Sequence, residues 1–246
     1  TLYGITMDHL GLMGWVVGAN GTIYGWNGEQ CYAVPSGTNA TLRSVCMTND
    51  NSQAWAVGDN GTILTWTNST NTWTKLNSPT NEPLYDVQIT NATYGWAVGG
   101  AGGNGTIISL NSSGWAVWKK INFGGMMGVN STVNDRVNAT LYSLSLNNAT
   151  SAWAVGDQGT VLYWGGTQWD GQSNVANADL RGVSMVHGSF TGFGQAWAVG
   201  TGGMIIAWAG STWVPEIPFI ALPAVLCIGV ALAVFSRARS NKRIRG

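Results

Sequence analysis

The chain has 246 residues, enough for one sizeable hydrophobic core, and 45% of them are hydrophobic whereas only 9% are charged. This composition excludes an intrinsically disordered chain, and 35 Gly with 14 Trp favour β structure over helix. Residues 1–216 carry 6 Lys/Arg and 11 Asp/Glu, a net charge of −5, and residues 217–246 carry +5. Because the larger part has no excess of positive charge, nucleic acid is excluded as a partner.

A Trp-rich phrase recurs five times. It reads WVVGANGTIYGW from Trp15 and WAVGDNGTILTW from Trp55, and its other copies begin at Trp96, Trp153 and Trp197, in steps of 40, 41, 57 and 44 residues. A second word precedes each copy: LYGITM, LRSVCM, LYDVQI, LYSLSL and LRGVSM in chain order. Several short β-strand motifs that recur about every 40 residues are typical of a β-propeller.

Each copy predicts four strands. Strand A is the LYxVxM word, strand B is WAVG, strand C is GTIL-W, and strand D is a short word around Cys31, Trp73, Trp115, Trp169 or Trp213. The words ANG, DNG, GNG, DQG and TGG between B and C favour positive φ and tight hairpins. We therefore predict an all-β fold, a five-bladed β-propeller over residues 1–214.

The Trp side chains are predicted to pack between blades rather than to stack on a ligand, because each can bury about 150–250 Å². No strand is exchanged between the chain ends, so we expect Trp197 and Trp208 to close the ring by packing on blade one. In this strand register Cys31 lies at the outer edge of a blade and Cys46 at the inner edge. Three strand spacings of about 4.8 Å exceed the reach of a disulfide, so free thiols are predicted.

The step of 57 residues indicates an insertion in residues 122–138 after strand D of blade three. Met126 and Met127 lie between glycines in this insertion. Two interpretations remain open, a partner-binding contact through these methionines and a loop folded onto its own blade.

The run from Ile217 to Phe235 has 19 residues without a charge, enough to span a hydrocarbon core of about 30 Å. The basic tail that follows places the C-terminus in the cytoplasm. We predict a transmembrane helix over residues 215–236 in contact with lipid through 217–235, and a cytoplasmic tail over 237–246. Thr1 as first residue is typical of an exported protein after removal of a signal peptide. The predicted location is the cell membrane, single-pass, with the propeller extracellular.

Ten Asn-x-Ser/Thr sequons precede the span, a density that predicts a glycoprotein with N-linked glycans. The acceptors are Asn20, Asn39, Asn60, Asn68, Asn91, Asn104, Asn111, Asn130, Asn138 and Asn148. Turn chemistry alone accounts for Asn20, Asn60 and Asn104. A Thr- and Asn-rich β composition that produces sequons by chance is the alternative.

Residues with catalytic or metal-binding chemistry are sparse. His9 and His187 both follow the leading Leu of their blades by seven residues, so ring closure would bring them together beside Asp8. Two imidazoles and a carboxylate are ligands for a transition metal, although isolated loop histidines have the same pattern. The sequence predicts no other cofactor. It contains no Walker loop, no Gly-x-Ser-x-Gly and no His-Glu-x-x-His, so no enzyme is predicted, and Asp86 is the one acid on a strand A.

The phrase WAVGDNGTIL resembles the repeats of the photosystem II assembly and stability factor family and of the broader sialidase-type propellers. This resemblance covers the B–C hairpin in five copies and implies a propeller fold. The Asp-box of sialidases is absent, since TNSTNTW at 67–73 keeps only its Trp and hydroxyls. The segment VPEIPFIALP, the apolar run and the basic tail resemble archaeal C-terminal sorting signals, in which a sortase-like enzyme removes the tail; here we expect the span to be retained.

These patterns predict a membrane-anchored, glycosylated extracellular propeller that binds or scaffolds surface components or a membrane protein complex. A subunit of a surface lattice or filament is one alternative. An enzyme that acts on surface glycans or peptides at the channel mouth, with Asp86 as its candidate acid, is another.

Overall fold

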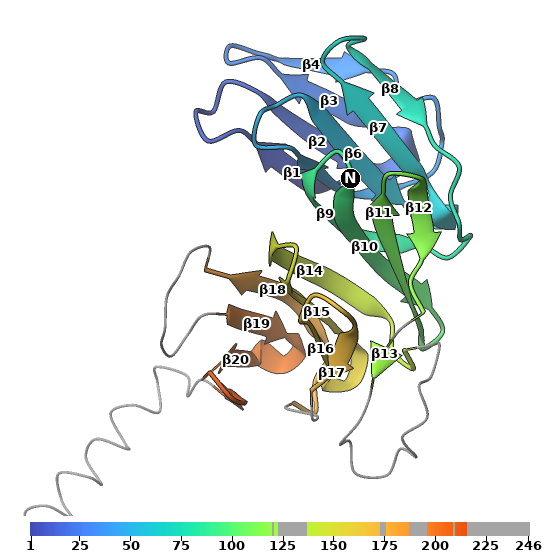
Figure 1. Cartoon of the computed structure of the whole chain (residues 1–246). Helices are drawn as coiled ribbons and strands as arrows, with labels where there is room; N and C mark the ends of the chain where they lie inside the picture. Colours follow the sequence, from blue (N-terminus) through green and yellow to red (C-terminus); the bar gives the residue numbers. More distant parts are fainter. Residues whose placement is uncertain (120, 123–136, 173–175, 187–195, 209, 216–246) are drawn as a thin grey trace, which may run out of the picture.

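The structure is a computed structural model, shown in Figure 1, and it describes residues 1–119, 121–122, 137–172, 176–186, 196–208 and 210–215. The described residues form five sheets, each built on a blade of four antiparallel strands in sequence order, and the sheet of the fourth blade has one additional strand. This confirms the predicted all-β fold and the four strands A to D of each repeat.

The strands of each blade are given in the order A to D. Blade one comprises β1 (Leu2–Met7), β2 (Gly14–Gly18), β3 (Ile23–Trp26) and β4 (Cys31–Val34). Blade two comprises β5 (Leu42–Met47), β6 (Gln53–Gly58), β7 (Ile63–Thr67) and β8 (Thr72–Lys75). Blade three comprises β9 (Leu84–Asn91), β10 (Tyr94–Ala101), β11 (Asn104–Asn111) and β12 (Gly114–Val117). Blade four comprises β14 (Leu141–Asn148), β15 (Ser151–Gly156), β16 (Val161–Trp164) and β17 (Trp169–Gly171). Blade five comprises β18 (Leu180–Met185), β19 (Ala196–Gly200), β20 (Ile205–Trp208) and β21 (Trp213–Pro215).

The B–C hairpins of four blades turn through one short 3-10 segment with a middle residue at positive φ. These segments are η1 (Ala19–Gly21), η2 (Asp59–Gly61), η3 (Asp157–Gly159) and η4 (Thr201–Gly203). Blade three turns instead at Gly102 and Gly103, with φ of 61° and 82°. Asn104, predicted as a hairpin residue, therefore begins β11.

Tryptophans join consecutive blades. The strand-B Trp15 of blade one contacts Trp66 and Trp73 on strands C and D of blade two, with ring centroids 5.0 and 5.2 Å apart. Trp96 makes the same contacts with blade four, and Trp153 with blade five. Trp residues of strands B, C and D thus form the cores between blades, as predicted.

The predicted ring closure is wrong. Trp197 is 40% exposed, whereas the strand-B tryptophans of the other four blades are at most 4% exposed. Leu2 at the start of blade one is 54% exposed, whereas the leading Leu of every other blade is fully buried. Figure 1 accordingly shows the blades as an open arc. The repeat determines how one blade packs on the next, but it does not determine how many blades complete a turn.

The insertion after blade three adds a strand to its neighbour. β13 (Ile121–Asn122) pairs in parallel with β17 at the outer edge of blade four. Val137 returns to the fold through an isolated bridge to Gly105. Met126 and Met127 lie outside the described residues, so both interpretations of this pair stay open.

Both cysteines of the propeller are free, as predicted. Cys31 is exposed on β4, and Cys46 is buried on β5, where burial raises the pKa of its thiol. The predicted span and basic tail lie outside the described residues. Within the part of the chain that the structure describes, no helix is long and apolar enough to cross a membrane.

Candidate functional site

Each strand A has a β-bulge at its second residue. In blade one Leu2 pairs with Gly18 and Gly4 with Val17, so Tyr3 is the extra residue between them. The same shift occurs in the other four blades. The five extra residues are Tyr3, Arg43, Tyr85, Tyr142 and Arg181. A bulge redirects the side chain of its extra residue, which makes this position suited to function rather than to the core.

The last glycine of WAVG makes this geometry possible. A Cβ on Gly58 would lie 2.0 Å from the carbonyl oxygen of Thr41, just before strand A, and Gly18, Gly99, Gly156 and Gly200 are equally crowded. The same Thr41 oxygen accepts a hydrogen bond from Asp59 N at 2.9 Å. The start of strand A is therefore attached to the B–C hairpin, and both lie on one face of the propeller.

Four of the five bulge residues form a continuous line of ring and guanidinium contacts, and Tyr3 extends it. Arg43 Cζ lies 4.9 Å from the ring centroid of Tyr85 and 5.9 Å from that of Tyr3. The rings of Tyr85 and Tyr142 are 5.4 Å apart, and Arg181 Cζ lies 3.8 Å from the centroid of Tyr142. We call these five residues the Tyr–Arg band. Cation–π contacts of this kind hold the arginines over the rings while part of each side chain stays exposed.

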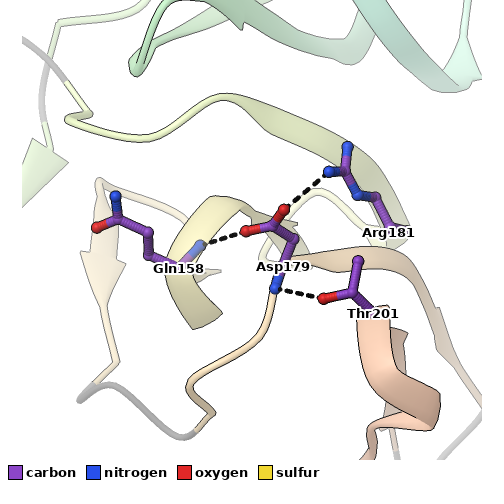
Figure 2. A network of polar contacts seen from close by, with 4 residues as sticks. All are labelled: Gln158, Asp179, Arg181 and Thr201. Carbon is purple, nitrogen blue, oxygen red and sulfur yellow. Dashed lines mark hydrogen bonds and ion pairs between the residues drawn. The ribbon is translucent and has the colours of Figure 1, made fainter.

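Carboxylates from the hairpins and the D–A connections fix the arginines. Arg43 Nε donates to Asp59 Oδ1 at 2.6 Å, and Arg181 Nη2 donates to Asp179 Oδ2 at 2.8 Å. Figure 2 shows that Asp179 also accepts from Gln158 N of blade four and donates through its own N to Thr201 Oγ1. Asp179 thus ties blade four to blade five beneath Arg181. A shallow hollow adjoins this network, lined by Gln158, Asn177, Ala178, Asp179 and Thr201.

The band combines two residue types that dominate protein interfaces. Tyr and Arg are enriched among the residues that contribute most to binding between proteins, because they offer large apolar contact and directed hydrogen bonds. Burial, and next the neighbouring Asp157 carboxylate, raises the pKa of Tyr142, so its phenol remains protonated at neutral pH. The band can therefore contact apolar side chains and donate hydrogen bonds to carbonyl groups, whereas the charges of its two arginines are already balanced by Asp59 and Asp179.

Asp86 is a structural residue rather than a candidate acid. It is half-buried at the inner edge of blade three, where it accepts from Ser44 Oγ at 2.7 Å and from Leu144 N at 2.8 Å. Its own strand contributes Val87 N at 2.8 Å, and Ser143 Oγ lies at 3.3 Å. Ser143 Oγ in turn accepts from Val183 N of blade five. One carboxylate therefore connects the inner strands of blades two, three and four, and Ser143 extends the network to blade five.

The predicted metal ligands are not brought together among the described residues. Asp8 accepts from Leu12 N, Met13 N and Asn51 Nδ2, so its carboxylate orders the loop after β1. His9 is exposed, and His187 lies outside the described residues. No cluster of three potential ligands occurs in the described part of the chain. The packing of blade one on blade five, on which this prediction depended, is not seen.

The sequon asparagines of the described residues are all exposed: Asn20, Asn39, Asn60, Asn68, Asn91, Asn104, Asn111, Asn138 and Asn148. Asn130 lies outside the described residues. In Asn91, Asn111 and Asn148 the Oδ1 atom accepts from the backbone two residues later, which orders a turn. A glycan attaches to the other amide atom, so this turn and glycosylation are compatible.

No family model and no curated protein sequence matches this chain. Many solved structures do. U3-55K matches at 10% identity with a TM-score of 0.62, over 87% of this chain and 65% of that one. YCF48 from Cyanidioschyzon merolae matches at 16% identity with a TM-score of 0.61, over 87% and 70%. A structure of YCF48 bound to D1 peptide matches at 18% identity with a TM-score of 0.59, over 87% and 67%.

These likenesses define the class of fold: the described part of the chain is a β-propeller with WD40-like relatives in structure. The presence of YCF48 among them agrees with the resemblance of the hairpin phrase. The chain spans about two thirds of the length of these solved propellers. The resemblance to a sorting signal stays a prediction.

The Tyr–Arg band was not among the sites predicted from the sequence. Its signal was the second letter of the five strand-A words, which reads Tyr, Arg, Tyr, Tyr and Arg. Asp59 and Asp157, the first residues of the hairpin motifs DNG and DQG, each also face a band residue. A position that is polar or aromatic in every copy, beside an invariably apolar Leu, could have indicated the site.

Proposed function

We propose that this protein is a protein-binding or scaffolding module whose Tyr–Arg band receives a segment of a partner protein. The observation that carries the proposal is the continuous line of three tyrosines and two arginines along one face. The comparison with YCF48 bound to D1 peptide adds support, because it is a propeller of like fold with a peptide partner. A partner segment with apolar side chains and free backbone carbonyl groups complements the band.

The proposal includes the membrane. The apolar run 217–235 and the basic tail support a single-pass anchor with an extracellular propeller, and the exposed sequons support glycosylation. Only Glu216 separates β21 from the apolar run, and strand D ends on the face where strand A begins. The Tyr–Arg band therefore faces the headgroups in this arrangement, which makes a membrane protein the natural partner class.

The test compares three forms of the full chain, tagged in native membranes: wild type, the double variant R43A/R181A and the control K75A. Lys75 is exposed on β8, outside the band. After cross-linking and quantitative mass spectrometry, we expect the same partner with wild type and K75A and its loss with the double variant. Equal recovery of that partner with all three forms would refute the proposal.

The two alternatives can be separated in the same material. Ordered self-association of the purified chain that survives R43A/R181A would favour a lattice or filament subunit. A turnover activity on surface glycans or peptides would favour an enzyme, but both carboxylate oxygens of the half-buried Asp86 are already engaged in hydrogen bonds within the propeller.

A further inference from the structure

Two apolar faces border the opening of the arc. Blade five exposes Trp197, Val199 and Ile205, with exposed fractions of 40%, 48% and 44%. Blade one exposes Leu2, Ile5 and Met7 on the other side of the opening, with exposed fractions of 54%, 67% and 45%. Clusters of exposed apolar side chains mark interaction sites on folded proteins.

These faces are the two halves of an interface that the chain already makes four times. The counterparts of Trp197, Val199 and Ile205 in the other blades are buried: Trp15, Val17 and Ile23; Trp55, Val57 and Ile63; Trp96, Val98 and Ile107; Trp153, Val155 and Val161. The counterparts of Leu2 are buried as well: Leu42, Leu84, Leu141 and Leu180. We call the side of a blade that carries its strand-B Trp the trailing face, and the side that carries its leading Leu the leading face. The trailing face of one blade therefore fits the leading face of another blade.

The Trp contacts specify what the trailing face of blade five requires. Trp153 lies against Trp208 and Trp213 on strands C and D of the next blade, at 4.9 and 5.1 Å. Trp197 has the same position on its blade and is exposed. The complementary chemistry is a four-stranded blade with a leading Leu and aromatic side chains on its two outer strands.

The size of the opening selects the partner. Solved propellers of this fold are about half as long again as the part that this chain matches. A propeller of seven blades falls within the usual range. Because this chain contributes five blades, the opening accommodates about two more. A second copy of this chain has five blades and would be too large. We propose that the opening is an interaction surface for a partner segment that contributes about two further blades of the same repeat. This inference is independent of the Tyr–Arg band.

The probe is a tandem duplicate of residues 42–83, which contains blade two and its connection to blade three. Added to the full chain, it should form a one-to-one complex and reduce the binding of a hydrophobic dye to the exposed faces. Because an isolated tandem can fail to fold, the same tandem is also fused ahead of Thr1 of the full chain. The fusion should raise the melting temperature by about 5 °C or more and abolish the binding of a hydrophobic dye.

Two variants make the result specific. V199D should remove the gain in melting temperature in the fusion, whereas V117D, at an exposed valine on β12 outside both faces, should keep it. A fusion no more stable than the unfused chain would overturn the proposal. So would self-association of the unfused chain that V199D abolishes, because the partner would then be a second copy. Val98 is the buried counterpart of Val199 in blade three. If V199D destabilised the unfused chain as strongly as V98D does, the ring would close with five blades.

Discussion

Asp86 shows how much one side chain contributes to the packing of blades. Its carboxylate accepts from residues of blades two, three and four, and these part-buried donors would all lose their partner if Asp86 were Ala. We expect D86A to lower the free energy of unfolding by about 1–3 kcal/mol, because hydrogen bonds to a charged group are lost. Chemical denaturation of the full chain measures this loss. A D86A chain as stable as wild type would contradict the network.

The same residue predicts a pH dependence. Burial raises the pKa of Asp86 above its ordinary value of about 3.9, so folding favours the protonated carboxyl. The contribution of Asp86 to the free energy of unfolding is complete at pH values below its pKa in the unfolded chain. This contribution is lost as pH rises through its raised pKa in the folded chain. The stability of wild type relative to D86N, which cannot titrate, should therefore fall between acid and neutral pH. A rise of this difference with pH would show that the hydrogen bonds outweigh burial.

Two tryptophans that each begin a WAVG motif have opposite environments. Trp96 is 1% exposed between blades three and four, whereas Trp197 borders the opening. W96A should cost about 3–5 kcal/mol by forming a cavity, and W197A should cost less than about 1 kcal/mol. Thermal and urea unfolding of both variants measures the contrast. Equal losses would place Trp197 in a closed core.

At the scale of the element, the B–C hairpin depends on the close approach of its last glycine to the connection that leads to the next blade. A Cβ on Gly61, at φ +63°, would lie 1.9 Å from Thr80 O, whereas one on Gly37, at φ +69°, meets nothing within 4 Å. G37A should therefore lower the free energy of unfolding by about 1–2 kcal/mol because of its backbone conformation alone. G61A should lower it markedly more, because its Cβ also collides with Thr80 O. Equal destabilisation in urea unfolding would show that the connection yields without cost.

The strands were predictable because local chemistry determines them. Asn-Gly and Asp-x-Gly motifs predicted the hairpins at η1, η2 and η3, and the recurring sequence motifs predicted the four strands A to D of each blade. The bulges that expose the Tyr–Arg band were not predictable, because the ladder register depends on contacts between strands. The parallel pairing of β13 with β17 was missed for the same reason, since it joins two blades.

For the whole molecule, the repeat predicted which faces meet but not the angle between blades, so the predicted closed ring was wrong.

The position of the propeller relative to the membrane remains a prediction. Asn68, Asn91, Asn111 and Asn148 lie at the strand ends opposite the Tyr–Arg band, whereas Asn20 and Asn60 lie on the hairpins beside it. If the band faces the membrane, the first four should have the highest glycan occupancy. Glycopeptide mapping decides this, and full occupancy of Asn20 with bare Asn91 and Asn148 would invert the orientation.

The central claim is that the Tyr–Arg band binds protein, and a titration of the recovered partner segment against the purified full chain tests it most directly. Arg43 and Arg181 are partly exposed and held over tyrosine rings, so removing either should weaken binding by about tenfold, equivalent to about 1.4 kcal/mol. We expect this loss for R43A and for R181A, and an unchanged Kd for K75A. Unchanged Kd values for both arginine variants would contradict the account.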